Sequence, residues 1–358
     1  MAGLTAQLDD KRNWFYVSVA LTIALTGLWL ASAFLIPLVF ALFLFMLLTA
    51  AIDGLRRVSI LGWHLPTGLA HALSLLVFMG TLAGLLAILY SQVDLVLEAL
   101  PQYEARLEAL LEELAASFGT DLSAAMERAA REIDIAANVT QLLGSAGTIV
   151  TSFALVGLYL AFLLADREAF TRKLSLLIPD AQECERFIAL LHSISLNVRR
   201  YLWIKTLTSI MTGGVAYAVM KPLGLDFAET WALLIFLLNF IPSVGSIMGT
   251  LLPALLALLQ FDSLTPFLLI LVGVGFAQVV IGNVIEPALT GRQLNLSTFL
   301  IILSLTLWTS LWGISGAFLS VPIMVVVLIV CAHVPAWRPL AIVLSRDGRL
   351  PDQGPLGR

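Results

Sequence analysis

The sequence is poor in charge, since Asp, Glu, Lys and Arg make up only 12% of its 358 residues. A soluble globular domain carries about 25% charged residues. Hydrophobic residues make up 59% of the chain, and the mean hydropathy is +0.96. Several apolar runs reach the roughly 20 residues that cross a hydrocarbon core of ~30 Å, and in lipid such runs must be helical to satisfy their backbone. The sequence therefore predicts an all-α polytopic membrane protein.

Other features are also scarce, and each absence excludes a class of function. The two cysteines, Cys184 and Cys331, lie in segments expected to be far apart, which does not favour a disulfide. The sequence contains no polybasic block, metal-ligand spacing, nucleophile–base constellation or Gly-rich phosphate loop. We therefore expect neither an enzyme nor a nucleic-acid-binding protein, and we expect no cofactor or bound metal.

Between polar stretches, the apolar runs predict about eight to ten hydrophobic helical segments. The predicted continuous spans are 14–30, 34–52, 67–90, 146–165, 201–220 and 266–285. Two further apolar blocks, 230–260 and 298–334, are interrupted. Each block is either a pair of short spans or a re-entrant hairpin. A charged helical segment, 166–200, precedes the fifth span and is broken at Pro179. A polar tail, 336–358, follows the last block.

Residues 91–145 differ from the segments on either side because they hold three arginines and ten acids. Apolar residues recur there at helical spacing, which predicts two amphipathic helices over 91–117 and 121–137. The region is too small for a large independent core. We expect it to serve as a surface for interaction or oligomerisation.

The positions of the basic residues predict the orientation in the membrane. With the N-terminus in the cytosol, 16 of the 20 Lys and Arg fall on the cytosolic side, as the positive-inside rule requires. Both termini are then cytoplasmic, and residues 91–145 are extracytoplasmic. The chain is expected in a bacterial inner membrane, as a three-span region 1–90, the acidic module 91–145, a transport core 146–335 and the tail.

The two interrupted blocks are the clearest functional signal. Paired apolar segments broken by Gly and Pro are the best sequence indication of a transporter's binding site, because a break frees backbone groups at membrane depth. Freed carbonyls can bind cations, and the N-termini of half-helices can bind anionic groups. The residues of the two breaks that we predict to line a site are Asn239, Pro242, Gly245, Gly249, Pro253, Gly313, Gly316 and Pro322.

Polar residues at membrane depth extend this candidate site. Gln278, Asn283 and Glu286 follow the first break at near-helical spacing. An ionisable group inside a membrane is a functional hypothesis by default. Glu286 would bind a proton, a cation or a polar solute, and the alternative is that it only caps its span before Pro287.

Three cations, Arg199, Arg200 and Lys205, cluster where the fifth span begins. One interpretation is that they reach the lipid phosphates. The other is that they form a candidate cytosolic gate whose charge pairs with Glu286.

Three motifs in order resemble the autoinducer-2 exporter (AI-2E) family of permeases. They are Asn239–Pro253, Gly282–Pro287 followed by Leu294–Leu296, and Leu311–Pro322. The family often has an aromatic residue and a proline where this chain has Ser243 and Ser246, and a proline near Ser297. The resemblance implies a permease whose relatives include exporters of small organic molecules and Na⁺ or Li⁺/H⁺ antiporters. It also implies a homo-oligomer, in particular a pentamer.

The leading hypothesis is therefore a secondary transporter that exports a small polar solute, such as a quorum-sensing signal. The first alternative is a Na⁺(Li⁺)/H⁺ antiporter. The second, of another class, is a membrane scaffold that binds a partner through 91–137. The expected partners are thus the lipid bilayer, a small solute or a monovalent cation or proton, and further copies of the chain.

Overall fold

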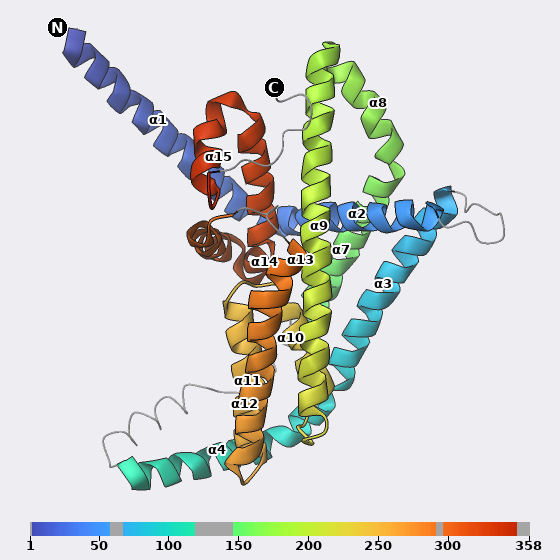
Figure 1. Cartoon of the computed structure of the whole chain (residues 1–358), viewed down its shortest axis with the longest axis vertical. Coiled ribbons are helices and arrows are strands. Elements are labelled where there is room, and N and C mark those ends of the chain that lie inside the picture. Colours follow the sequence, from blue (N-terminus) through green and yellow to red (C-terminus); the bar gives the residue numbers. More distant parts are fainter. Residues whose placement is uncertain (1, 58–66, 119–145, 291–295, 349–358) are drawn as a thin grey trace. The chain divides into compact units, whose positions relative to one another are not determined.

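The computed structural model describes residues 2–57, 67–118, 146–290 and 296–348 (Figure 1). Within these ranges the chain is helical, with one isolated β-bridge between Leu296 and Ser345. The predicted all-α polytopic class is confirmed. The helices are α1 (Ala2–Leu30), α2 (Ser32–Arg57), α3 (Thr67–Ser91), α4 (Val93–Phe118), α7 (Ala146–Ala165), α8 (Arg167–Leu177), α9 (Ala181–Met220), α10 (Ala228–Leu238), α11 (Val244–Gln260), α12 (Leu264–Val280), the π-helix η1 (Ile281–Ile285), α13 (Glu286–Thr290), α14 (Thr298–His333), the 3₁₀-helix η2 (Pro335–Trp337) and α15 (Arg338–Leu344).

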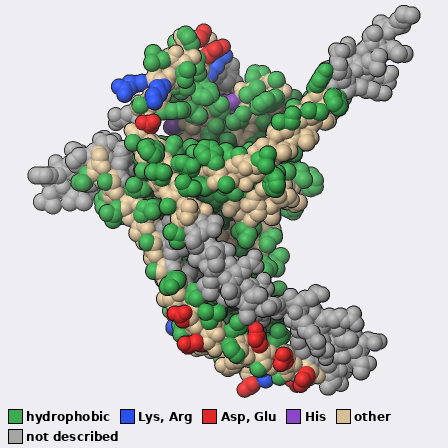
Figure 2. All heavy atoms as spheres, turned by 180° about the vertical axis from the view of Figure 1, so that it is seen from behind, with side chains coloured by type: hydrophobic (Ala, Val, Ile, Leu, Met, Phe, Trp, Pro, Cys, Tyr) green, Lys and Arg blue, Asp and Glu red, His purple; other side chains and the backbone are tan. Residues whose placement is uncertain are grey.

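By length and composition alone, three described helical stretches could cross a membrane, namely 32–49, 264–290 and 298–333, although the last is interrupted at Gly313. Shorter apolar helices cover 15–30, 72–85, 150–165, 228–238 and 244–260. Figure 2 shows hydrophobic side chains over much of the visible surface. A water-soluble protein rarely exposes so much contiguous apolar surface, whereas a membrane protein exposes it to lipid.

Helix boundaries differ from the sequence prediction in three places. α9 is one continuous helix of 40 residues, although we predicted a charged segment and a separate span. Nothing between Pro179 and Met220 stops a helix, since a change from polar to apolar residues does not interrupt backbone hydrogen bonds. The span expected to stop at Glu286 continues through η1 and α13 to Thr290.

The third difference is in the tail, which begins with the apolar helix α15. Two of its residues, Ala341 and Leu344, are buried. The predicted amphipathic helix over 121–137 lies outside the described residues, whereas its neighbour is α4.

The chain forms two compact units. Unit 1 comprises residues 1–45, 158–194 and 295–358, and unit 2 comprises 46–157 and 195–294. In unit 1, α14 is a helical hairpin, because Gly313 takes φ 60° and ψ −141° and reverses the chain. Ser304 Oγ donates to the carbonyl of Ser320 at 3.0 Å across the two arms. Trp312 Nε1 donates to Leu28 O at 3.0 Å, which ties the hairpin to α1.

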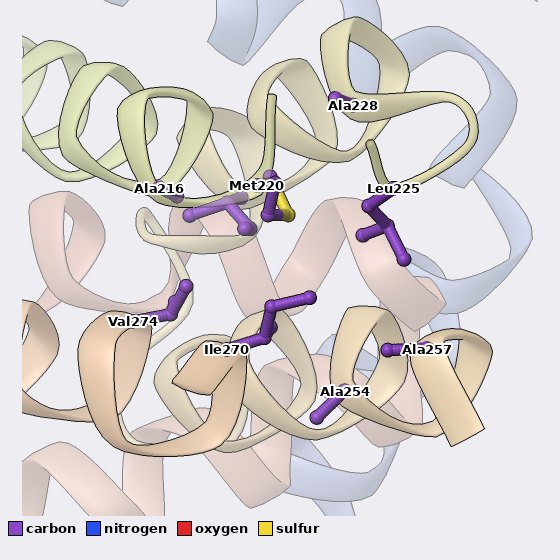
Figure 3. Packing of buried hydrophobic residues seen from close by; sticks show 9 residues of the cluster. Ala216, Met220, Leu225, Ala228, Ala254, Ala257, Ile270 and Val274 are labelled. Atoms are coloured by element: carbon purple, nitrogen blue, oxygen red, sulfur yellow. The ribbon is translucent and has the colours of Figure 1, made fainter. Parts of the chain in front are cut away.

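Unit 2 is built around a bundle of α9, α10, α11 and α12, whose apolar core lies where α9 ends and α10 begins (Figure 3). Small residues let the helices approach each other closely, as is common in membrane bundles. A Cβ added at Gly213 of α9 would lie 2.8 Å from Ala232 O of α10. The nine buried core residues are Ala216, Met220, Leu225, Ala228, Ile235, Ala254, Ala257, Ile270 and Val274.

Candidate functional site

The first predicted break is a tight helical hairpin in unit 2. α10 ends at Leu238, and the chain reverses through Ser243, whose φ of 61° is unusual for a residue with a side chain. α11 then begins at once, so close to α10 that a Cβ at Gly245 would overlap the carbonyl of Leu238. Glycine is thus required at 245 for the close approach of the two backbones.

Polar groups gather where α9 passes this hairpin. Four residues of α9 are buried although they are polar, and they recur at intervals of three and four along one helix face. We predicted only the first of them as a site residue. The same spacing in an otherwise apolar stretch is a signal in the sequence that would have identified the other three. The four residues are Lys205, Thr208, Ser209 and Thr212.

Asn239, directly after α10, joins this polar face. Its Nδ2 donates to Ser209 Oγ at 3.0 Å, and both residues are buried. Because the Ser209 oxygen accepts this bond, its own proton is left to donate to another group. Thr208 and Thr212 donate to backbone carbonyls of α9 at 3.1 Å and 2.8 Å. The first break and α9 therefore form one polar region.

Gln278 of α12 faces the same hairpin. Its Nε2 atom is buried without a hydrogen-bond partner, and it lies 3.3 Å from the position of a Cβ at Gly249. Four residues further on, Pro253 has no N–H, so the Gly249 carbonyl lacks its usual α-helical donor. A buried donor without a partner costs about 1–3 kcal/mol unless something binds it. Gln278 and Gly249 thus offer a donor and a backbone acceptor at one place.

An ion pair lies at the other end of this polar region. Lys205 Nζ contacts both carboxylate oxygens of Glu286 at 3.0 Å. The side chains are 10% and 25% exposed, so the pair is largely shielded. Of the three clustered cations, Lys205 makes this contact, whereas Arg199 donates to Met46 O and Thr49 Oγ1 of α2 and Arg200 is exposed.

Glu286 follows a widened turn. η1 is a π-helix, and π turns inside α-helices frequently occur at functional sites. Glu286 separates η1 from Pro287, whose ring would crowd the carbonyl four residues back, that of Asn283, in a regular α-helix. The wider turn relieves this crowding and lets the helix continue. Asn283 in this turn is exposed, whereas Gln278 is buried, so these two predicted site residues differ in environment.

The second predicted break belongs to unit 1, and its layout parallels the first. Gly313 has a positive φ, and a Cβ at Gly316 would overlap the carbonyl of Trp308. Pro322 is buried in the second arm, as Pro253 is in α11. Each unit therefore contains one hairpin in which a glycine lets the returning helix touch the end of the first.

Both Gly-dependent hairpins and the Asn-Val-Ile-Glu-Pro turn lie within the part of the chain that matches a known family. The sequence profile of the family described as AI-2E family transporter matches residues 19–336. This chain belongs to the AI-2E family. As a member of that family, it is a membrane transport protein.

Individual relatives in the AI-2E family support the same assignment. The AI-2 transport protein TqsA of Escherichia coli (strain K12) is 32% identical over 331 residues, which cover 91% of this chain and 93% of TqsA. The putative transport protein YhhT of the same organism is 28% identical over 348 residues, or 95% and 97% of the two chains. A putative transport protein of Haemophilus influenzae is 29% identical over 337 residues, or 91% and 94%.

Proposed function

We propose that this AI-2E family member is a secondary transporter that exports a small, neutral, hydroxyl-bearing solute through unit 2. The observation that carries the proposal is the unpartnered Nε2 of Gln278 beside Gly249, whose carbonyl lacks its helical donor. A hydroxyl group both accepts and donates a hydrogen bond, and it would satisfy both groups at once. We also propose that the chain lies in the inner membrane with both termini in the cytosol.

The charges nearby favour a neutral solute over an ionic one. Lys205 and Glu286 neutralise each other at 3.0 Å, and the other buried side chains of the polar region are amides and hydroxyls. An unpaired ion would have to lose its hydration without a counter-charge, which is costly in a shielded site. TqsA, the relative named as an AI-2 transport protein, provides the first solute to test.

Replacing Gln278 with leucine is the direct test of this site. We expect solute export to fall about fivefold or more, because leaving a buried polar group of the solute without its hydrogen bond costs about 1–3 kcal/mol. We expect thermal stability to stay the same or to rise, because the variant removes a buried donor without a partner. Export of AI-2 from cells producing the wild-type or variant chain measures the first effect, and unfolding in detergent measures the second.

Thr250 supplies a matched control for this test. It lies on α11 next to Gly249, and its hydroxyl is already bonded to the carbonyl of Ser246 at 3.0 Å. Thr250→Val should leave export within about twofold of wild type, since this local bond is worth only about 1 kcal/mol. Unimpaired export by a correctly folded Gln278→Leu variant would remove Gln278 from the site.

A second candidate function, Na⁺ or Li⁺ exchange for H⁺, rests on the same two residues. A Gln278 side chain rotated to present its oxygen would, with the Gly249 carbonyl, offer two neutral oxygen ligands to a cation. Glu286 would then bind the exchanged proton after its ion pair with Lys205 has broken. Restored growth in high salt of a strain that lacks its own antiporters would support exchange over solute export.

Two further predictions concern the assembly of the chain and the role of 91–137. The homo-oligomer, in particular the pentamer that the family resemblance implies, stays a prediction, as does the scaffold role of 91–137. Cross-linking in native membranes followed by mass analysis would measure the copy number. Deleting 91–137 and measuring both partner capture and export would separate a scaffold from a transporter.

A further inference from the structure

One helix outside the four-helix bundle of unit 2 contacts two of its loops. α4 contacts loop 221–227, which joins α9 to α10, and loop 261–263, which joins α11 to α12 (Figure 1). Tyr103 Oη donates to Asp226 Oδ2 at 2.6 Å, and Arg106 Nη2 pairs with Asp262 Oδ1 at 3.0 Å. We call the end of the bundle that carries these two loops the loop end.

The two contacts differ in strength. Asp262 is 98% exposed, and an ion pair in that setting contributes little because water screens it. Tyr103 is buried, and its short hydrogen bond to a carboxylate belongs to the stronger charge-assisted class. Burial, together with the hydrogen bond to Asp226 and its charge, raises the pKa of Tyr103. The hydroxyl therefore keeps its proton and remains a donor throughout the physiological pH range.

The bond from Tyr103 is part of a small network that ties both loops together. The backbone N–H of Asp226 donates to Gln260 Oε1 at 2.8 Å, and Gln260 Nε2 donates to Gly224 O at 2.8 Å. Gln260 is the last residue of α11, so it connects the start of one loop to the other. α4 therefore contacts two loops that are already joined to each other by hydrogen bonds.

α4 is built to bind on one face only. Leu100 and Tyr103, one turn apart, are buried, whereas Glu104 and Glu108 are exposed. Figure 2 shows acidic side chains gathered along α4. The binding face lies at the loop end, where Leu225 and Ala257 contribute to the apolar core. The polar region around Gln278 lies further along the bundle, beyond this core.

We propose that α4 is a strap that keeps the loop end of the bundle closed over its apolar core. For α9 and α11 to separate at that end, α4 must release one of the two loops, and the bond from Tyr103 to Asp226 is the stronger of its two polar contacts with them. The proposal does not depend on which solute is carried, and its test measures access to the core and not transport.

The test is the rate at which a cysteine in the core reacts with a membrane-impermeant maleimide. The reporter is Ala257→Cys, with Cys184 and Cys331 replaced by serine, in the full chain in right-side-out and inside-out vesicles. Ala257 is fully buried, so the reporter should react slowly from either side. Adding Tyr103→Phe should speed labelling from the α4 side about tenfold or more, because a lost bond to a charged group shifts a local opening equilibrium by at least that factor.

Controls decide whether the effect belongs to the strap. Glu104→Gln changes the exposed face of α4 and should leave the labelling rate within about twofold. Asp226→Asn weakens the same bond without altering α4, and it should act in the same direction as Tyr103→Phe. An unchanged labelling rate in both Tyr103→Phe and Asp226→Asn would overturn the proposal. An equal increase in Glu104→Gln would also overturn it, because general loosening of the fold would then explain the result.

Discussion

Replacing Gly245 with alanine should prevent the chain from folding normally, since the added Cβ would overlap the carbonyl of Leu238. Both groups belong to the backbone or lie next to it, so no side-chain rotation can relieve the overlap. The hairpin of α10 and α11 would have to open, at a cost of at least about 3 kcal/mol. We expect loss of the monodisperse peak in size-exclusion chromatography in detergent, together with lower yield in the membrane.

Two neighbouring glycines in α9 provide a graded control. A Cβ at Gly214 meets nothing within 4 Å, so Gly214→Ala should be neutral or stabilise the helix by up to about 1 kcal/mol. A Cβ at Gly213 would lie 2.8 Å from Ala232 O, so Gly213→Ala should be intermediate. The apparent melting temperature should therefore fall in the order Gly214→Ala, Gly213→Ala, Gly245→Ala. A stable Gly245→Ala variant would show that the hairpin is looser than the structure indicates.

Neutralising Glu286 alone should have the second large effect. Glu286→Gln leaves Lys205 charged, shielded and without its carboxylate partner. Removing one member of a buried pair costs about 3–5 kcal/mol, and we expect the lower end of this range because Glu286 is 25% exposed. Export should fall together with stability. Measuring both in one membrane preparation gives the first half of the test.

The double variant Lys205→Met with Glu286→Gln separates a structural role from a transport role. Replacing both partners by neutral groups is often close to neutral for stability, so folding should recover to within about 1 kcal/mol of wild type. If the pair takes part in transport, export should remain about tenfold or more below wild type. Recovery of both stability and export would show that the pair is only structural.

A second ion pair in unit 2 is the control for how much stability an exposed pair contributes. Lys221 and Glu229 are 2.6 Å apart, but their side chains are 56% and 43% exposed. Glu229→Gln should change stability by less than about 1 kcal/mol, as is usual for exposed pairs. If Glu229→Gln lost as much stability as Glu286→Gln, shielding from water would not explain the effect of breaking the pair between Lys205 and Glu286.

Composition and apolar run length were enough to predict the membrane class, and most helix boundaries fall within a few residues of those predicted. The exceptions have physical causes. α9 continues across the boundary at Tyr201 because backbone hydrogen bonding is indifferent to side-chain polarity. The stop predicted at Pro287 is absent because the π turn before it makes room for the proline ring. Neither effect produces a periodic signal in a single sequence.

The candidate site was predicted only in part. Asn239 and Gln278 were identified because polar residues are conspicuous in apolar segments, and the structure places both in the same unit with buried side chains. Ser209 and Thr212 were overlooked because hydroxyls are common in membrane helices, and their shared face is visible only once spacing is considered. Lys205 and Glu286 pair although they are 81 positions apart in the sequence. Sequence spacing alone does not indicate which of the three clustered cations contacts Glu286.

The apolar core of α9 to α12 has a consequence for the rate at which anything crosses unit 2. Side chains such as Ile270 and Val274 are fully buried in the bundle beside the loop end, so apolar groups occupy its interior there. If the solute crosses unit 2, as we propose, it passes this part of the bundle only when the helices separate and close again, once for each molecule carried. On this proposal we expect the bundle to work as a slow, saturable carrier rather than a conducting pore, and planar-bilayer recordings of the purified chain should show no unitary current steps through it.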